Sequence, residues 1–173
     1  MTEKCYVCQS CGMPLLSEDD FGKETNGKNS EIYCRYCYQS GVFTDEKVTL
    51  GEMAARCGVI LSDMYGIPAE NAGAFSLEQL KNLKRWSGRI IPNCESCGMP
   101  LTNEDEKGTM QDGSKSEKYC YHCYMNGNYT EPDLTKEKMI KKCTPLIASQ
   151  LSIKTEDAEK MVRIYISSIP RWR

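Results

Sequence analysis

The chain has 173 residues, 40% of them hydrophobic, and a formal net charge of −2 at pH 7. This length allows one ordinary domain or two small ones. A slightly acidic chain does not favour broad contact with phosphate backbones, and no apolar run approaches the ~20 residues that a membrane-spanning helix needs. The first residues lack the apolar segment of an export signal. We therefore expect a reducing, cytoplasmic environment, in which the 11 cysteines bind metal instead of forming disulfides.

The chain is one unit written twice at a constant offset. Cys8 recurs as Cys94, and the register continues without a gap to the end of each unit, where Arg85-Trp86 recurs as Arg171-Trp172. A duplication that holds its register over the whole chain indicates two copies of one structural unit. We predict two tandem domains, residues 5–88 and residues 89–173.

The front part of each repeat carries two C-x2-C pairs separated by a polar, Gly-rich run. Two residues between cysteines let both sulfurs point to one side of a tight turn, and two facing turns offer four thiolates, which suit a tetrahedral zinc ion. Iron in a rubredoxin-like site is the alternative, because four thiolates also bind iron. We call each pair a cysteine turn and predict one metal site per repeat, with these ligands: Cys8, Cys11, Cys34 and Cys37 in the first, and Cys94, Cys97, Cys120 and Cys123 in the second.

Short strands are expected around the second cysteine turn of each repeat. The Gly-rich middles, residues 22–30 and 108–116, are typical of turns that join such strands. Gly12 and Gly98 follow the first turn, where a positive φ would let backbone amides face the sulfurs. A core this small gives only marginal stability by itself, so we expect a bound metal ion to stabilise it.

The back part of each repeat is predicted to be helical. In the first repeat, Thr49 and Glu52 form a capping box. Gly66 and Pro68 predict a break, and Ser76 is a second candidate cap. Helical spacing predicts this apolar face after the first cap: Met53, Cys57, Ile60, Leu61 and Met64.

The second repeat has the same helical pattern, with one irregularity. Pro145 falls inside its first helix and should kink or split it. Thr155 is expected to open the next helix, followed by an acidic first turn. The two apolar faces are predicted to contain Met139, Cys143, Leu146, Ile147 and Leu151, and then Met161, Ile164, Tyr165 and Ile169.

Several other residues with useful chemistry lie outside the two sets of four. The repeat places Ile91 opposite Cys5, which favours a spare thiol, although an exchanged ligand is the alternative. Cys57 and Cys143 fall on apolar helix faces, which favours core packing over a redox role. The one histidine, His122, corresponds to Tyr36, so we expect neither a ligand role nor a catalytic site, and we interpret the chain as a non-enzyme. For Trp86 and Trp172 we favour packing over a ligand platform.

The cysteine turns and their flanks resemble a known family. The pattern C-x-S-C-G-M-P-L, followed by a polar turn and Y-C-x-x-C-Y-x-x-G-x-[FY]-T, occurs at residues 8–44 and 94–130. It is similar to the bacterial and archaeal family called the putative zinc ribbon domain. Phe21 and Asn26 depart from the pattern of the second copy, where Lys107 and Asp112 stand, and this affects the turn only. The resemblance implies an α+β fold with two tandem repeats, each a small four-cysteine zinc ribbon of short antiparallel strands followed by a two-helix segment, and two zinc ions held by the eight cysteines.

Function is less constrained than the metal sites. Members of the family look uncharacterised, and some are fused to transcription-regulator domains. We interpret the chain as a zinc-binding protein whose ribbons form a protein-interaction or regulatory surface. The alternatives are nucleic-acid binding and a thiol redox or metal-handling role. The oligomeric state stays open, and a membrane partner is not expected. A nucleic acid would contact the locally basic segment of the second repeat, which contains Lys136, Lys138, Lys141 and Lys142.

Overall fold

The computed structural model describes residues 5–173 and contains two copies of one α+β arrangement. The first repeat consists of η1 (Glu18–Asp20), β1 (Phe21–Lys23), β2 (Asn29–Cys34), β3 (Tyr38–Gln39), β4 (Val42–Phe43), α1 (Leu50–Tyr65), α2 (Ala69–Leu80) and the short α3 (Lys84–Ser87). The second consists of η2 (Glu104–Glu106), β5 (Lys107–Thr109), β6 (Lys115–Cys120), β7 (Tyr124–Met125), β8 (Asn128–Tyr129), α4 (Lys136–Leu151), α5 (Thr155–Ser168) and η3 (Pro170–Trp172). The predicted fold class is confirmed.

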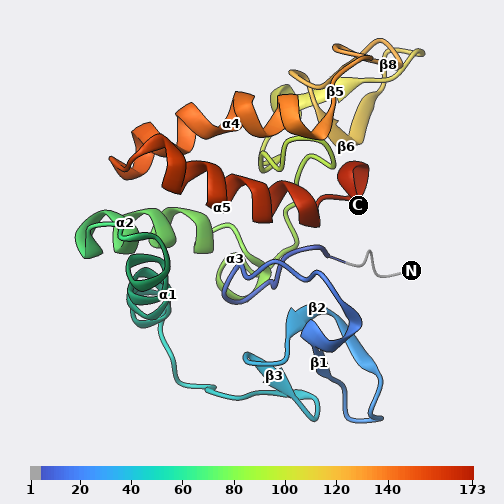
Figure 1. The fold of residues 1–173 in the computed structure, drawn as a ribbon. Coiled ribbons are helices and arrows are strands. Elements are labelled where there is room, and N and C mark those ends of the chain that lie inside the picture. The colour runs from blue at the N-terminus through green and yellow to red at the C-terminus, as the bar shows by residue number, and fades with distance from the viewer. Residues whose placement is uncertain (1–4) are drawn as a thin grey trace.

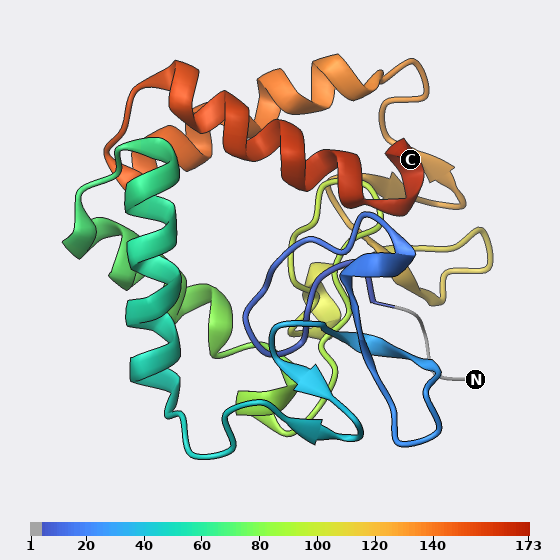
Figure 2. The same ribbon diagram turned by 60° about the horizontal axis from the view of Figure 1, so that its bottom comes forward.

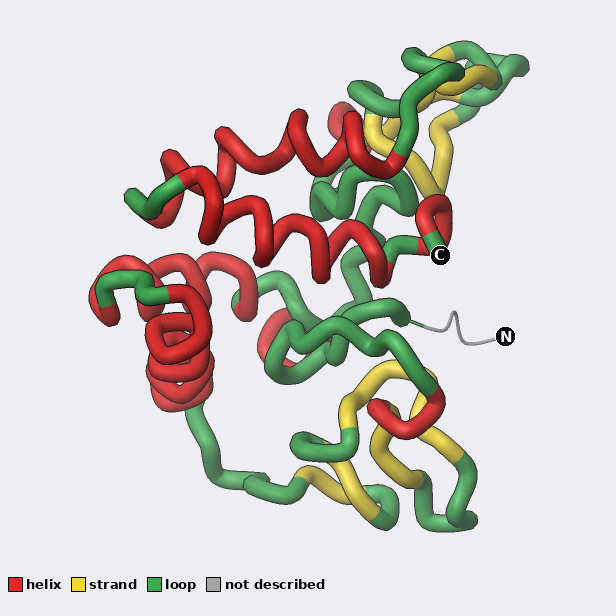
Figure 3. Tube along the Cα trace, in the orientation of Figure 1, coloured by secondary structure: helices red, strands yellow, loops and turns green. Residues whose placement is uncertain are grey.

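Each ribbon is built from two separate antiparallel strand pairs, β1 with β2 and β3 with β4, and then β5 with β6 and β7 with β8. The first cysteine turn lies outside these strands and is closed by an isolated bridge between Val7 and Pro14, which recurs between Asn93 and Pro100. Figure 3 shows that the strands of the two ribbons lie in separate parts of the molecule, with the long helices gathered to one side. Such short strands bury little surface, so the packing of side chains and the grouping of the cysteines must stabilise each ribbon.

Three aromatic rings pack together beside the second cysteine turn of each ribbon. Tyr33 lies 5.1 Å from Tyr38 and 5.0 Å edge-on from Phe43, measured between ring centroids. The second ribbon repeats the cluster with Tyr119, Tyr124 and Tyr129. Edge-to-face pairs of this kind stabilise a structure beyond their buried area, so they reinforce strands that are only two residues long.

The first long helix of the first repeat begins where the sequence predicts. The Thr49 hydroxyl accepts a 3.3 Å bond from the Glu52 amide, and the Glu52 carboxylate accepts a 2.8 Å bond from the Thr49 amide. The helix ends before Gly66, which has a φ of 66°. The predicted cap at Ser76 is wrong, because α2 begins at Ala69 and Ser76 is buried within it. Ser76 lies four residues from both Ala72 and Leu80, on the buried face of α2, so it packs inside the helix instead of capping one.

The predicted apolar face of α1 is partly wrong. Ile60 and Met64 are 56% and 61% exposed, and the face that packs inward contains Met53, Ala54 and Gly58. A Cβ on Gly58 would lie 2.9 Å from the Cα of Gly73 in α2, so these two helices approach each other backbone to backbone. Close approach at small residues turns the helix so that larger apolar side chains lie outside.

In the second repeat, Leu146 and Ile164 are likewise exposed, while Ile140 and Ile166 are buried. Pro145 does not split α4, which is continuous from Lys136 to Leu151. Because Pro145 lies on the exposed side of the helix, the carbonyl that loses its partner can bond to water. Burial of Ile140 and Leu151 on either side of the proline keeps the helix in place.

The two repeats form one packed structure. The helical pairs meet in a shared apolar cluster centred on Ile67, Ala72 and Leu151. There α2 contacts α4 and α1 contacts α5, and Figure 1 shows the four helices gathered on one side of the molecule. Tyr6 and Val7 precede the first ligand of the first repeat but belong to the core of the second. Figure 2 shows the blue N-terminal segment of the first repeat passing beside the yellow-green start of the second, where the Tyr6 hydroxyl donates to the Cys94 carbonyl at 3.4 Å. Within residues 5–173, no helix has the length and apolar character to cross a membrane.

Candidate metal centres

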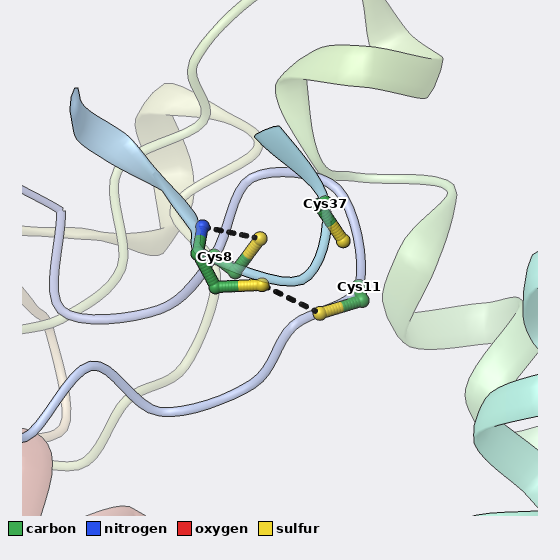
Figure 4. A group of neighbouring side chains, drawn as sticks. Cys8, Cys11 and Cys37 are labelled. Atoms are coloured by element: carbon green, nitrogen blue, oxygen red, sulfur yellow. Dashed lines mark hydrogen bonds between the residues drawn. The ribbon is translucent and has the colours of Figure 1, made fainter. Parts of the chain in front are cut away.

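The first repeat brings four sulfurs together. The Sγ atoms of Cys8, Cys11, Cys34 and Cys37 all lie within 4.8 Å of one another, and those of Cys11 and Cys34 are 3.7 Å apart. Zinc bonded to four sulfurs at ~2.3 Å would separate neighbouring sulfurs by ~3.8 Å in a tetrahedron. The sulfurs therefore fit a tetrahedral metal ion, and Figure 4 shows the side chains of Cys8, Cys11 and Cys37 converging.

The second repeat builds the same group independently from Cys94, Cys97, Cys120 and Cys123, again with all sulfurs within 4.8 Å. The Cys97 and Cys120 sulfurs are 3.6 Å apart. In each group three cysteines are buried and the second, Cys11 or Cys97, is partly exposed. Disulfides are absent from the part of the chain that the structure describes. All eight predicted ligands are thus brought into two groups of four.

The backbone around the sulfurs supports anionic ligands. The amide of Cys34 donates a 3.2 Å bond to the Sγ of Cys8, drawn as a dashed line in Figure 4. Gly12 and Gly98, which follow the first cysteine turns, have φ values of 74° and 82°. A residue with a Cβ would be strained there, so these glycines allow the turn that folds the chain around the sulfurs.

The four thiols of one group cannot all ionise together without a cation. Hydrogen bonds from Cys11, Cys34 and Cys8 hold the pKa of Cys37 far below its usual range, while hydrogen bonds to Cys34 and Cys37 raise the pKa of Cys11. The Cys37 sulfur is therefore the thiolate, and the neighbouring Cys11 keeps its proton. A divalent cation would remove this conflict by stabilising all the thiolates and releasing the remaining protons.

The comparisons with known proteins agree with this geometry. A family model described as "Putative zinc ribbon domain" matches residues 7–87 and again residues 93–173. The chain belongs to this family. Each match ends one residue beyond an Arg-Trp pair, so the unit of the zinc ribbon family includes the helices as well as the cysteine turns. Neither the search of curated proteins nor that of solved structures found a match.

The Arg-Trp pair at the end of each zinc ribbon repeat contacts the first cysteine turn, which sequence analysis did not foresee. The indole Nε1 of Trp86 donates to the Ser10 carbonyl at 2.8 Å, and Arg85 Nη1 donates to the Ser10 hydroxyl at 3.1 Å. Trp172 and Arg171 repeat these bonds to Ser96 at 2.5 and 2.8 Å. The recurrence of Arg-Trp together with C-x-S-C in both copies is the signal that could have predicted the contact.

The other cysteines stay outside the two groups. Cys5 is not among the four sulfurs of the first group, and its amide donates to the Glu31 carbonyl at 2.9 Å. Cys57 is half-buried and donates to the Cys11 carbonyl at 3.7 Å, and burial raises its pKa to about 11. Cys143 is also half-buried, beside the sulfur of Met139. These positions favour packing over thiolate chemistry.

The histidine lies at the exposed tip of the second cysteine turn. The ring of His122 stacks on that of Tyr121 at 4.0 Å between centroids, and it is not part of the sulfur group. At the same position of the first repeat, the hydroxyl of the exposed Tyr36 accepts a bond from Arg35 Nη2 at 3.0 Å. The tips of both second turns therefore carry exposed aromatic rings.

Proposed function

We propose that this chain is a zinc-binding protein in which two closed four-cysteine sites fold two ribbons and thereby hold a surface that binds another protein. The observation that carries the proposal is the pair of sulfur groups, each of four cysteines with sulfur separations suited to zinc. A tetrahedron filled by four protein ligands leaves no position for a substrate or water. The sites are therefore structural, and we propose no enzymatic activity.

A protein partner is favoured by the outer face of α1. Val59, Ile60 and Met64 are each more than half exposed and lie on one side of this helix. Apolar side chains grouped on a surface are typical of a protein interface. Because the same face also carries Glu52 and Arg56, a partner would combine an apolar contact with a few charged ones.

Nucleic acid is the alternative partner, through the lysines of α4. Three of these four are already engaged within the chain: Lys142 pairs with Glu131, Lys136 donates to the Trp172 carbonyl, and Lys138 donates to the Asp133 carbonyl. A phosphate backbone would have to compete with these contacts. We therefore favour protein over nucleic acid.

A thiol redox or metal-handling role is the other alternative. The raised pKa of Cys57 argues against a reactive thiolate there. Within the described residues all 11 cysteines are free of disulfides, which supports a reducing compartment such as the cytoplasm.

Native mass spectrometry of the purified protein tests the metal part of the proposal. We expect two zinc ions per chain, and their mass separates zinc from iron. Protein that folds without bound metal would overturn it.

The partner is tested with a photo-crosslinking residue at position 60. We expect crosslinks from this position to a protein in cells, and none from position 156, an exposed polar position on α5. A product of twice the chain mass would identify a second copy as the partner. Equal crosslinking from both positions would count against the α1 face.

A further inference from the structure

The guanidinium group near the end of each repeat links the first cysteine turn to the segment that follows the second turn. Arg85 donates through Nη1 to Ser10, inside the first turn, and through Nη2 to the carbonyl of Asp45 at 2.5 Å, beyond the second turn. The same group stacks on Phe43, 3.9 Å from the ring centroid. Only a planar, forked cation can make all three contacts at once.

The second repeat makes this junction independently. Arg171 donates to the Ser96 hydroxyl at 2.8 Å and stacks on the ring of Tyr129 at 3.7 Å. In the first repeat the Arg-Trp pair lies in a helical turn, α3, whereas in the second it lies in the 3₁₀ turn η3. The contacts with the serine and with the aromatic ring recur although the local backbone differs, so the local helix type does not impose them.

The serine that receives the guanidinium lies between two ligands. Ser10 and Ser96 are fully buried, and each directly precedes the second ligand of its turn, Cys11 or Cys97. In the first repeat Arg85 therefore contacts the residue next to a ligand. Groups that orient metal ligands in this way commonly change metal affinity when they are removed.

We propose that Arg85 and Arg171 are positioning residues that clamp the two cysteine turns of their repeats together and so slow the release of the bound metal. An ion held by four sulfurs can leave only when one turn moves away from the other. The clamp opposes that movement, because Arg85 contacts Ser10 on one side and Phe43 and Asp45 on the other. This inference rests on the proposed function, since it requires a resident metal.

The test is the rate at which zinc passes from the fully loaded protein to a chromogenic chelator. Arg85→Met should speed the release of one of the two ions by about tenfold, at the lower end of the effects of such groups on affinity, and leave the other ion at the wild-type rate. Arg171→Met should do the same for the other ion. Arg89→Met, at an exposed arginine between the repeats, is the control and should release both ions at the wild-type rate.

Two further variants separate a clamp from a simple effect of charge or stability. Arg85→Lys should release zinc as fast as Arg85→Met, because an ammonium group cannot stack and bridge at the same time. Ser10→Ala should speed the same ion, and the double variant Ser10→Ala/Arg85→Met should be no faster than the quicker single variant. Circular dichroism of each loaded variant reports whether the helices are retained.

The proposal is overturned if lysine restores slow release, if both ions accelerate equally in Arg85→Met, or if that variant releases zinc at the wild-type rate. Metal content is measured first, so that a failure of the proposed function can be distinguished from a failure of the clamp. A wild-type protein without metal removes the proposed function together with the clamp. Two bound ions with release rates indifferent to Arg85 and Arg171 remove the clamp alone.

Discussion

At the scale of single residues, we expect each cysteine of the two sulfur groups to contribute more to the stability of its ribbon than any apolar side chain near it. Structural zinc contributes roughly 10–16 kcal/mol of apparent binding free energy at neutral pH, against about 5–15 kcal/mol for the stability of a whole domain. Cys97→Ser should therefore unfold the second ribbon while α4 and α5 persist. Near-ultraviolet circular dichroism should lose the signal of the packed tyrosines, and the far-ultraviolet helical signal should largely remain.

Cys143→Ser is the matched control, since Cys143 is a half-buried thiol outside the sulfur group. It should keep both metal ions and the tyrosine signal. An unchanged spectrum in Cys97→Ser would mean that the ribbon holds its shape without the metal, contrary to the size of its core.

The thiol protons predict how metal binding depends on pH. Hydrogen bonds to neighbouring cysteines raise the pKa of Cys11 and of Cys97 in the metal-free groups, so these protons are present at neutral pH and must leave when metal binds. Apparent zinc affinity should therefore rise with pH, by about tenfold per pH unit for each proton displaced. Competition titrations between about pH 6 and about pH 8 measure this slope, and a flat profile would show that the thiols are already ionised.

At the scale of elements, the contact between α1 and α2 depends on the absence of a side chain. A Cβ on Gly58 would lie 2.9 Å from both the Cα and the amide nitrogen of Gly73. Since backbone cannot move aside as a side chain can, Gly58→Ala should destabilise the protein by about 1–3 kcal/mol. Denaturant unfolding of the zinc-loaded protein measures the change.

The same helix provides the control for this substitution. A Cβ on Gly51 would meet no heavy atom within 4 Å, so Gly51→Ala should be neutral or stabilising by up to about 1 kcal/mol. If both substitutions had the same effect, helix propensity would explain it and the close contact of the two helices would not.

The elements also show what the sequence could predict. The capping box at Thr49 and the break at Gly66 are determined by neighbouring residues, and both were predicted correctly. Ser76 offered the same kind of local signal, yet it lies inside α2, because its neighbours along the helix are buried. The outward position of Ile60 follows from the contact of Gly58 with Gly73, which hydrophobicity alone does not reveal.

For the candidate metal centres, too, the sequence predicted some features and missed others. Cysteine spacing and duplication predicted two groups of four sulfurs, because two residues between cysteines restrict a turn almost completely. The contacts of Arg85 with Ser10 span most of a repeat in sequence. They depend on how the helices return the chain to the ribbon, so the cysteine spacing does not predict them, and only the recurrence of Arg-Trp in both copies points to them.

At the scale of the whole molecule, Tyr6 joins the two repeats. Its backbone carbonyl accepts a bond from Leu15 in the first repeat at 2.9 Å. Its ring is 8% exposed within the core of the second, and its hydroxyl donates to the carbonyl of Cys94 at 3.4 Å. Tyr6→Ala should therefore destabilise the second ribbon, by about 3–5 kcal/mol for a large buried ring, although the residue belongs to the first.

Hydrogen exchange of the amides at residues 94–101 measures this effect, and they should exchange faster in Tyr6→Ala. Tyr36→Ala serves as the control, since that ring is 64% exposed and lies at the tip of the first ribbon. Protection that is unchanged in Tyr6→Ala would mean that the two repeats are stable independently of each other.

The position of Tyr6 also has a consequence for the order of events during synthesis. The ribosome delivers Tyr6 long before it delivers Cys94, so a nascent first repeat can close its own sulfur group while the ring of Tyr6 still faces water. The place where that ring is buried exists only after the second ribbon has emerged and folded. The first repeat, although it is synthesised first, therefore reaches its complete packing only when the second ribbon has folded.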